Sequence, residues 1–232
     1  CDDVSYVNST AVTQTINRTT YYVNDGTTGD DTWCSAVGND ANNGTSTSTP
    51  KATLAAALAL VSCGDIIYVD KGTYTEENLN IPDNTDDVSI IGAGSDKTIF
   101  DGDNTDDWLT FASGGNTVNV TITDMTVKEY GGTTVTQNGG CLRVLGGTGI
   151  VFQDMIFHSM DTEGSYNDGG VMYANNASSV EFDRCIMHNN ESGDMGGVLR
   201  WSSSGTLTMK NCLVYEKIWT SAGGTMRSTQ NC

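Results

Sequence analysis

The sequence predicts an all-β protein, a right-handed parallel β-helix closed at its amino-terminal end by a short capping α-helix. Three observations predict this fold class: one stretch recurs four times, a Gly-Gly pair follows every copy, and the apolar positions of the copies stay in phase. The copies begin 30, 30 and 27 residues apart. A fixed period in this range is typical of a solenoid.

The four copies read as strands rather than helices. Apolar residues alternate within each copy, as at Ile150 and Phe152, which is the two-residue period of a strand. Because equivalent positions of successive coils lie about 4.8 Å apart, we expect each aligned column to form a continuous apolar row inside the coil. The four copies are Val120–Lys128, Ile150–His158, Val180–His188 and Leu207–Tyr215. The first aligned column consists of Ile122, Phe152, Phe182 and Met209, and the second of Met125, Met155, Cys185 and Cys212.

The glycine pairs recur once per coil, at residues 139–140, 169–170, 196–197 and 223–224. Glycine is the residue of choice where the backbone needs a positive φ or approaches another chain segment closely. We therefore expect these pairs to be corners of the coil and not a phosphate-binding loop.

The segment 50–62 is predicted to be the capping helix. Pro50 suits a helix start, Leu54, Leu58 and Val61 share one apolar face, and Gly64 ends the segment. Such a helix would cover the first core layer, which would otherwise meet water.

The opening of the chain resembles that of the pectin-lyase-like right-handed parallel β-helix proteins. The motifs that carry this resemblance are Tyr21–Asp25, Gly38–Thr45, Thr49–Leu58, Gly64–Tyr74 and Ser89–Gly92. The resemblance implies the fold but leaves the activity open, because that group contains lyases, glycosidases and adhesins.

The predicted organisation is an extended arm at residues 1–20 and one β-helix domain at 21–232, with a cap at 21–63 and coils at 64–232. Cys232 comes before a further coil could close after Gly223-Gly224. We therefore expect an uncovered carboxyl-terminal end, and we leave open whether the domain continues beyond it. Such an edge invites pairing, and the arm at 1–20 is a candidate to complete a neighbouring molecule.

Composition limits the environment and the partners. The formal net charge of −18 argues against nucleic acid and anionic membranes as partners. No stretch approaches the roughly 20 apolar residues of a membrane span. Seven cysteines and six Asn-x-Ser/Thr sequons favour an extracellular or cell-surface protein. The sequons, which also arise by chance in such a chain, are at Asn8, Asn17, Asn43, Asn119, Asn176 and Asn190.

Cys34 and Cys63 are the predicted disulfide, because they bracket one small folded element. Cys185 and Cys212 are expected to be buried thiols rather than a bridge. Because the number of cysteines is odd, at least one of them is not in a disulfide within this chain. Cys1 and Cys232 are the candidates, although Cys1 could instead be an acylated start.

The best candidate site is a column of side chains three residues beyond the glycine pairs. Arginine and tyrosine suit carboxylates and sugars, so this column is predicted to bind an acidic glycan or an acidic partner. Surface filling by residues that suit a strand is the alternative. Its members are Arg143, Tyr173, Arg200 and Arg227.

Other polar positions give weaker predictions of a binding or catalytic site. His158 and His188 share a column with Lys128 and Tyr215, but two histidines without a third ligand are a weak metal signal. Asp124 and Asp154 stack, although Arg184 and Asn211 follow them in the column. We assign no catalytic residue, cofactor or metal site; calcium in the loops 101–107 or 40–44 is kept as an alternative.

The sequence therefore favours a secreted or surface-displayed structural or adhesive protein without enzymatic activity, self-associating through its uncovered end and its arm into a head-to-tail filament. The alternatives are a polysaccharide lyase or hydrolase and a glycan-binding module, both directed at an acidic polysaccharide.

Overall fold

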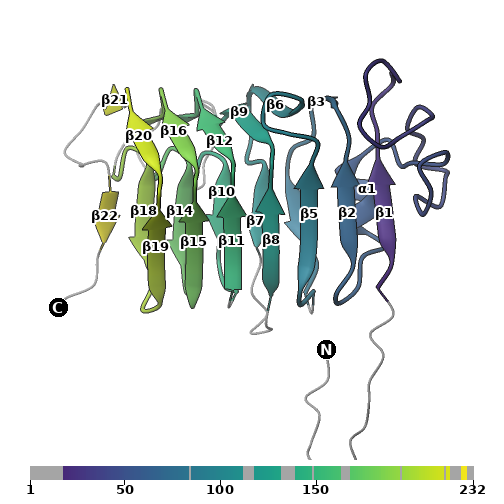
Figure 1. The fold of residues 1–232 in the computed structure, drawn as a ribbon. Coiled ribbons are helices and arrows are strands. Elements are labelled where there is room, and N and C mark those ends of the chain that lie inside the picture. Colours follow the sequence, from purple (N-terminus) through teal and green to yellow (C-terminus); the bar gives the residue numbers. More distant parts are fainter. Residues whose placement is uncertain are drawn as a thin grey trace, which may run out of the picture.

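The chain forms a parallel β-helix, in which each coil contributes strands to three long sheets (Figure 1). The structure is a computed structural model. It describes residues 18–83, 85–111, 118–131, 139–147, 149–162, 168–193 and 195–216, and the backbone of two strands at 218–219 and 226–228. All paired strands in these ranges run parallel. The predicted fold class is confirmed.

The sheets are named A to D, and their strands follow one another along the axis of the coil. Sheet A contains β1 (Thr20–Val23), β2 (Ile66–Val69), β5 (Val88–Gly92), β8 (Asn119–Thr123), β11 (Gly149–Gln153), β15 (Ser179–Asp183) and β19 (Thr206–Lys210). Sheet B contains β3 (Gly72–Tyr74), β6 (Thr98–Thr105), β9 (Thr126–Tyr130), β12 (Ile156–His158), β16 (Ile186–His188) and β20 (Leu213–Tyr215). Sheet C contains β4 (Leu79–Ile81), β7 (Leu109–Phe111), β10 (Leu142–Val144), β14 (Met172–Asn175), β18 (Leu199–Ser202) and β22 (Met226–Ser228). The short sheet D contains β13 (Asp161–Thr162), β17 (Glu191–Ser192) and β21 (Ile218–Trp219).

The core consists of the apolar columns that the repeats predict. Ile122, Phe152, Phe182 and Met209 are direct partners on successive strands of sheet A. The rings of Phe152 and Phe182 stack with centroids 5.0 Å apart. Each large apolar side chain buried in this way contributes about 1.5–3 kcal/mol, so the columns stabilise the coil along its whole length.

The turn between sheets A and B explains one polar column. Asp124, Asp154, Arg184 and Asn211 have φ angles of 62°, 53°, 53° and 54°. Asparagine and aspartate tolerate this left-handed conformation better than most residues. Their recurrence is therefore a requirement of the turn, and the residue after each turns inward, as fully buried Met125, Met155 and Cys185 do.

The two glycines of each corner have different tasks. The first has a positive φ, +99° at Gly139 and +75° at Gly169. The second allows close packing between coils: a Cβ on Gly140 would lie 2.3 Å from the carbonyl oxygen of Gly170. Both parts of the prediction are thus confirmed for the pairs at 139–140 and 169–170, and Gly196 likewise has a positive φ of +70°, whereas Gly223-Gly224 lies outside the described residues.

The capping helix is present but shorter than predicted. Helix α1 (Leu54–Leu58) begins after Thr53, whose side chain accepts a hydrogen bond from the Ala56 N–H, and not at Pro50. The Glu76 carboxylate accepts hydrogen bonds from the N–H groups of Leu54 and Ala55, at 2.7 and 2.8 Å. A side chain distant in sequence therefore helps to fix where the helix begins.

The predicted disulfide is wrong. The Cys34 thiol is free and buried, with its Sγ 4.0 Å from the Val23 carbonyl oxygen, whereas Cys63 belongs to a disulfide. Cys185 is a buried free thiol, as predicted, whereas Cys212 is free but only half-buried. Spacing along the chain failed here because Cys34 faces the first strand of sheet A.

The predicted domain division is not tested. Residues 1–17 of the arm lie outside the described residues, and so do 220–225 and 229–232 at the expected uncovered end. Residue Thr20, the last of the predicted arm, already belongs to β1 and pairs with β2. No helix in the described ranges is long and apolar enough to cross a membrane.

Candidate functional site

The outer face of sheet C carries the predicted column of arginine and tyrosine. Arg143 is the direct partner of Tyr173, Tyr173 of Arg200, and Arg200 of Arg227. Towards the amino-terminal end, the same column continues through Thr110 on β7 to Asn80 on β4. The alternate residues, such as Leu142 and Met172, are buried in the core. The sheet therefore turns Arg143, Tyr173 and Arg200 outward, whereas only the backbone of Arg227 is described.

Arg143 is paired with a carboxylate that the sequence analysis did not single out. Its Nε lies 3.3 Å from Oδ2 of Asp107, and the two side chains are 20% and 3% exposed. Burial raises the pKa of Asp107 to about 7, and nearby Asp106 adds to this, although the Arg143 guanidinium acts in the opposite direction. A carboxyl group that titrates near neutral pH is suited to proton transfer.

Two polar atoms of this pair are not hydrogen-bonded. Oδ1 of Asp107 and Nε of Arg143 are both buried and without a hydrogen-bond partner. Leaving such atoms unpaired is unfavourable, so a bound water molecule or ligand that pairs with them would be favoured. The backbone of Asp107 is fixed, because its carbonyl accepts a hydrogen bond from the Asn78 N–H at 2.7 Å.

A second pair repeats this arrangement further along the coil. Oδ2 of Asp168 lies 3.8 Å from Nε of Arg200, and both side chains are 12% exposed. In each pair the aspartate precedes a strand of sheet C and the arginine lies on the next strand. The other carboxylate oxygen of Asp168 accepts a hydrogen bond from the Met195 N–H at 3.1 Å, so Asp168 is held more firmly than Asp107.

Gly139, the corner glycine beside this face, leaves space for the side chains of the column. A Cβ on Gly139 would lie 2.9 Å from Cγ of Arg143 and 3.2 Å from Cβ of Tyr173. Any other residue would displace these two side chains, in addition to the strain of its positive φ.

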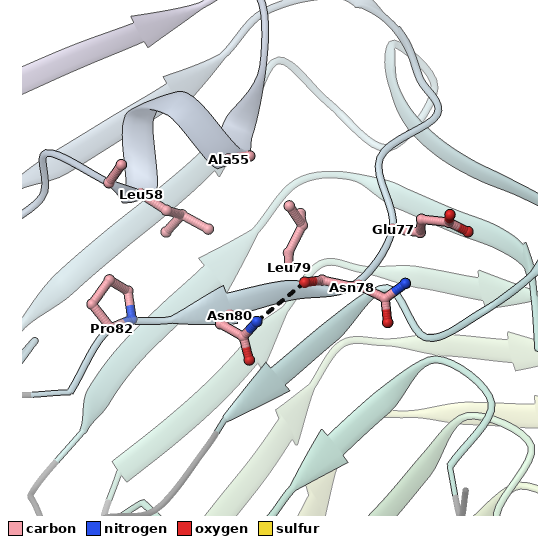
Figure 2. Close-up of a pocket in the computed structure, with 8 residues that line it drawn as sticks. Ala55, Leu58, Glu77, Asn78, Leu79, Asn80 and Pro82 are labelled. Atoms are coloured by element: carbon pink, nitrogen blue, oxygen red, sulfur yellow. Dashed lines mark hydrogen bonds between the residues drawn. The ribbon is translucent and has the colours of Figure 1, made fainter. Parts of the chain in front are cut away.

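A shallow pocket of about 280 Å³ lies at the amino-terminal end of the same face, between α1 and β4 (Figure 2). Figure 2 shows Ala55 and Leu58 of the helix opposite the strand that carries Leu79 and Asn80. The Asn80 side chain donates a hydrogen bond to the Asn78 carbonyl at 3.2 Å. The pocket lining consists of Ala55, Leu58, Ala59, Glu77, Asn78, Leu79, Asn80 and Pro82.

The histidine column lies on the outer face of sheet B. The rings of His158 and His188 stack at 4.9 Å, and those of His188 and Tyr215 at 5.0 Å. Lys128, next in the column, pairs with Asp101 at 2.6 Å. Among the described residues, no three His, Cys, Asp or Glu side chains gather as a metal-binding group.

The other acidic candidates are engaged in structural contacts. Arg184 donates two hydrogen bonds to Asp154, at 2.8 and 2.7 Å, and thereby holds the pKa of Asp154 below its usual range. Asp40 accepts hydrogen bonds from the N–H groups of Ala52 and Thr53. These carboxylates stabilise the turn between sheets A and B and the start of α1.

The sequons differ in accessibility. Asn190 is fully buried, accepts a hydrogen bond from the Met160 N–H and donates one to the Phe157 carbonyl, so the fold leaves no room for a glycan there. That candidate is wrong. Asn43 and Asn176 are exposed and Asn119 is half-buried, and they stay predictions, whereas Asn8 and Asn17 lie outside the described residues.

Comparison with known proteins identifies one family. The family model described as "Pectinesterase" matches residues 36–168, more than half of the chain. Among solved structures, a rhamnogalacturonan lyase matches at 16% identity and a TM-score of 0.49, covering 89% of this chain and 62% of the lyase. That likeness is too weak to support an argument, and the chain spans less than two thirds of the lyase. No curated protein matches.

The family match corrects the function predicted from the sequence. A structural or adhesive filament protein without enzymatic activity is contradicted, and the alternative of an enzyme acting on an acidic polysaccharide is favoured. The resemblance to pectin-lyase-like β-helix proteins is confirmed. Asp107 and Asp168 were missed because their carboxylates pair with arginines on the following coil, a contact that spacing alone does not reveal.

Proposed function

Because the chain belongs to the pectinesterase family, we propose that it is a carbohydrate esterase that hydrolyses the methyl esters of pectin. Pectin is an extracellular polymer of uronic acid units, so this function fits the secretion that the cysteines and sequons favour. The outer face of sheet C is the proposed active face, and its column of Arg143, Tyr173, Arg200 and Arg227 would hold the polymer.

The observation that carries this proposal is the Asp107–Arg143 pair. Ester hydrolysis needs a base that takes a proton from the attacking water and a positive group beside the oxygen that becomes negative. Asp107 combines a pKa of about 7 with a buried, unpaired Oδ1. Arg143 supplies a fixed positive charge 3.3 Å from the other carboxylate oxygen.

The step follows from these positions. Asp107 takes the proton of a water molecule as its oxygen attacks the ester carbonyl carbon. The tetrahedral intermediate carries a negative oxygen beside the Arg143 guanidinium. The C–O bond to the methoxy group then breaks and methanol leaves with the proton returned by Asp107. The carboxylic acid left on the sugar releases its remaining proton to solvent and becomes a carboxylate beside Arg143.

The test is release of methanol from highly esterified pectin by the Asp107→Asn variant. An amide cannot act as the base, so we expect kcat to fall by about 10²–10⁴-fold. Asp103→Asn is the matched control, because Asp103 is an exposed residue in the irregular part of β6 with a φ of 48°, which asparagine tolerates. Unchanged methanol release by Asp107→Asn would remove the proposed mechanism.

A further inference from the structure

The second apolar column of the core ends in two thiols. Its first two members are methionines, whose sulfur atoms cannot form a disulfide, whereas Cys185 and Cys212 occupy the next two positions. Both cysteines are free, and each follows directly after the turn between sheets A and B. The hydrolysis proposed for sheet C uses neither of them. This part of the core therefore carries two reactive groups whose role is open.

The two cysteines lie in register on successive coils. Sheet A pairs Asp183 with Lys210 two residues before them, and sheet B pairs the residues that follow them directly. The Leu213 N–H donates a hydrogen bond to the Cys185 carbonyl at 3.0 Å. At about 4.8 Å per strand, the Cα atoms of Cys185 and Cys212 are within the roughly 4.4–6.8 Å that disulfides span.

The two side chains point in the same direction. Sγ of Cys185 lies 3.4 Å from the Phe152 carbonyl oxygen, and Sγ of Cys212 lies 3.4 Å from the Phe182 carbonyl oxygen. Phe152 and Phe182 are themselves direct partners on successive strands, so one step along the coil relates the two thiols. Rotation of both side chains about their Cα–Cβ bonds, with an approach of the two turns by roughly 0.5 Å, brings the sulfur atoms to bonding distance.

The two thiols differ in their access to solvent. Cys212 is half-buried, whereas Cys185 is fully buried, and burial raises the pKa of Cys185 to about 12. A dissolved oxidant therefore reacts first at Cys212, because thiol exchange requires a thiolate that the reagent can reach. The chain already contains a disulfide, at Cys63, which is typical of proteins that mature in an oxidising compartment.

We propose that Cys185 and Cys212 are a site of oxidative modification, which a small dissolved disulfide such as oxidised glutathione converts into a disulfide between two successive coils. The Cys212 thiolate attacks one sulfur of oxidised glutathione, a mixed disulfide forms and one glutathione leaves. The Cys185 thiol then gives its proton to solvent and attacks Sγ of Cys212, and the second glutathione leaves and takes up a proton. Two protein thiols are thereby oxidised while one glutathione disulfide is reduced to two thiols.

The new bond would tie the coil that contains β19 and β20 to the coil before it. Leu213 on β20 is 55% exposed, so this coil is less well covered than the earlier ones, whose equivalent strands bury Phe157 and Met187 completely. A cross-link between coils restricts the unfolded chain, so the oxidised protein should unfold at a higher urea concentration than the reduced protein.

The test follows both cysteines through oxidation. The protein is incubated with oxidised glutathione, the remaining thiols are alkylated, and the tryptic peptides are analysed by mass spectrometry without reduction. Trypsin cleaves after Arg184, Arg200 and Lys210, so the two cysteines fall in separate peptides, 185–200 and 211–217. We expect loss of both alkylated peptides and appearance of the linked pair, lighter by two hydrogen atoms than the separate peptides, together with an increase in the urea midpoint.

Three variants sharpen the test. Cys185→Ser should stop the reaction at a glutathione adduct on Cys212, whereas Cys212→Ser should leave Cys185 unreacted. Cys34→Ser is the matched control, because Cys34 is also a free buried thiol with its pKa raised to about 12, and this variant should form the same linked pair as the unmodified protein. A Cys185 that stays alkylatable after oxidation, or that links to another cysteine, would overturn the inference. The result does not depend on the proposed esterase function, which methanol release tests separately.

Discussion

Sheets B and C each carry an outward column of cationic and aromatic side chains, and the two columns differ in how their polar groups are satisfied. In sheet B, Lys128 pairs with half-exposed Asp101, and the rings above it stack on one another. In sheet C, Arg143 pairs with Asp107, which is almost completely buried and keeps an unpaired oxygen. Similar columns in sequence therefore differ in chemistry, because burial raises the pKa of Asp107 to about 7 and leaves its Oδ1 without a hydrogen-bond partner.

The largest expected effect comes from removing the cation of each column. Arg143 and Lys128 are matched, with side chains 20% and 22% exposed and each paired with an aspartate. Arg143→Gln removes the charge beside the developing oxyanion, and we expect kcat for methanol release to fall about 10²–10³-fold. Lys128→Gln should leave it unchanged. Equal losses would show that the two columns do not differ in the way proposed.

The next effect is the pH dependence that Asp107 imposes on stability. Because burial raises the pKa of Asp107 from its ordinary value of 3.8 to about 7, the folded protein holds a proton between these pH values that the unfolded chain has released. Stability contributed by this proton is therefore present below about pH 4 and is lost as pH rises through about 7. Over the full window the loss is on the order of 4 kcal/mol.

Asp107→Asn should remove this dependence. Urea unfolding between pH 5 and pH 8 should show the unmodified protein losing stability relative to the variant as pH rises. The same deprotonation activates the base, so methanol release should increase over the interval in which stability decreases. Parallel stability curves for the two proteins would show that Asp107 does not titrate in this range.

Part of this structure was predictable from the sequence and part was not. The columns of sheets A, B and C were predictable, because a period of about thirty residues sets which residues become neighbours on successive coils. The start of α1 was not, because Glu76, in the segment between β3 and β4, accepts hydrogen bonds from its first N–H groups. Asp107 was visible only as part of a polar run. Its role depends on burial and on Arg143, thirty-six positions further along the chain.

The function was mispredicted because the expected uncovered end and the arm at 1–20 favoured a filament. Nothing in the spacing indicates which carboxylates lie beneath the arginines of sheet C, so no sign of a reacting group there was visible in the sequence. The pocket is likewise formed by a helix and a strand from different parts of the coil. Sequence periodicity therefore predicts the columns well, whereas the carboxylates that react beside them follow from tertiary packing.

The smallest expected effect concerns His158 in sheet B. Burial, stacked His188 and nearby Lys128 lower the pKa of His158, against the weaker opposing influence of Glu129 and Asp101. The folded protein therefore binds fewer protons here than the unfolded chain, and its stability should decrease as pH falls through about 6.5, the usual histidine value. His158→Gln should reduce this loss in urea unfolding between pH 8 and pH 5, in the direction opposite to the Asp107 effect. Because the column of sheet B faces away from the reaction, methanol release at pH 8 should be the same in this variant and in the unmodified protein, and a loss there would mean that the two faces are coupled.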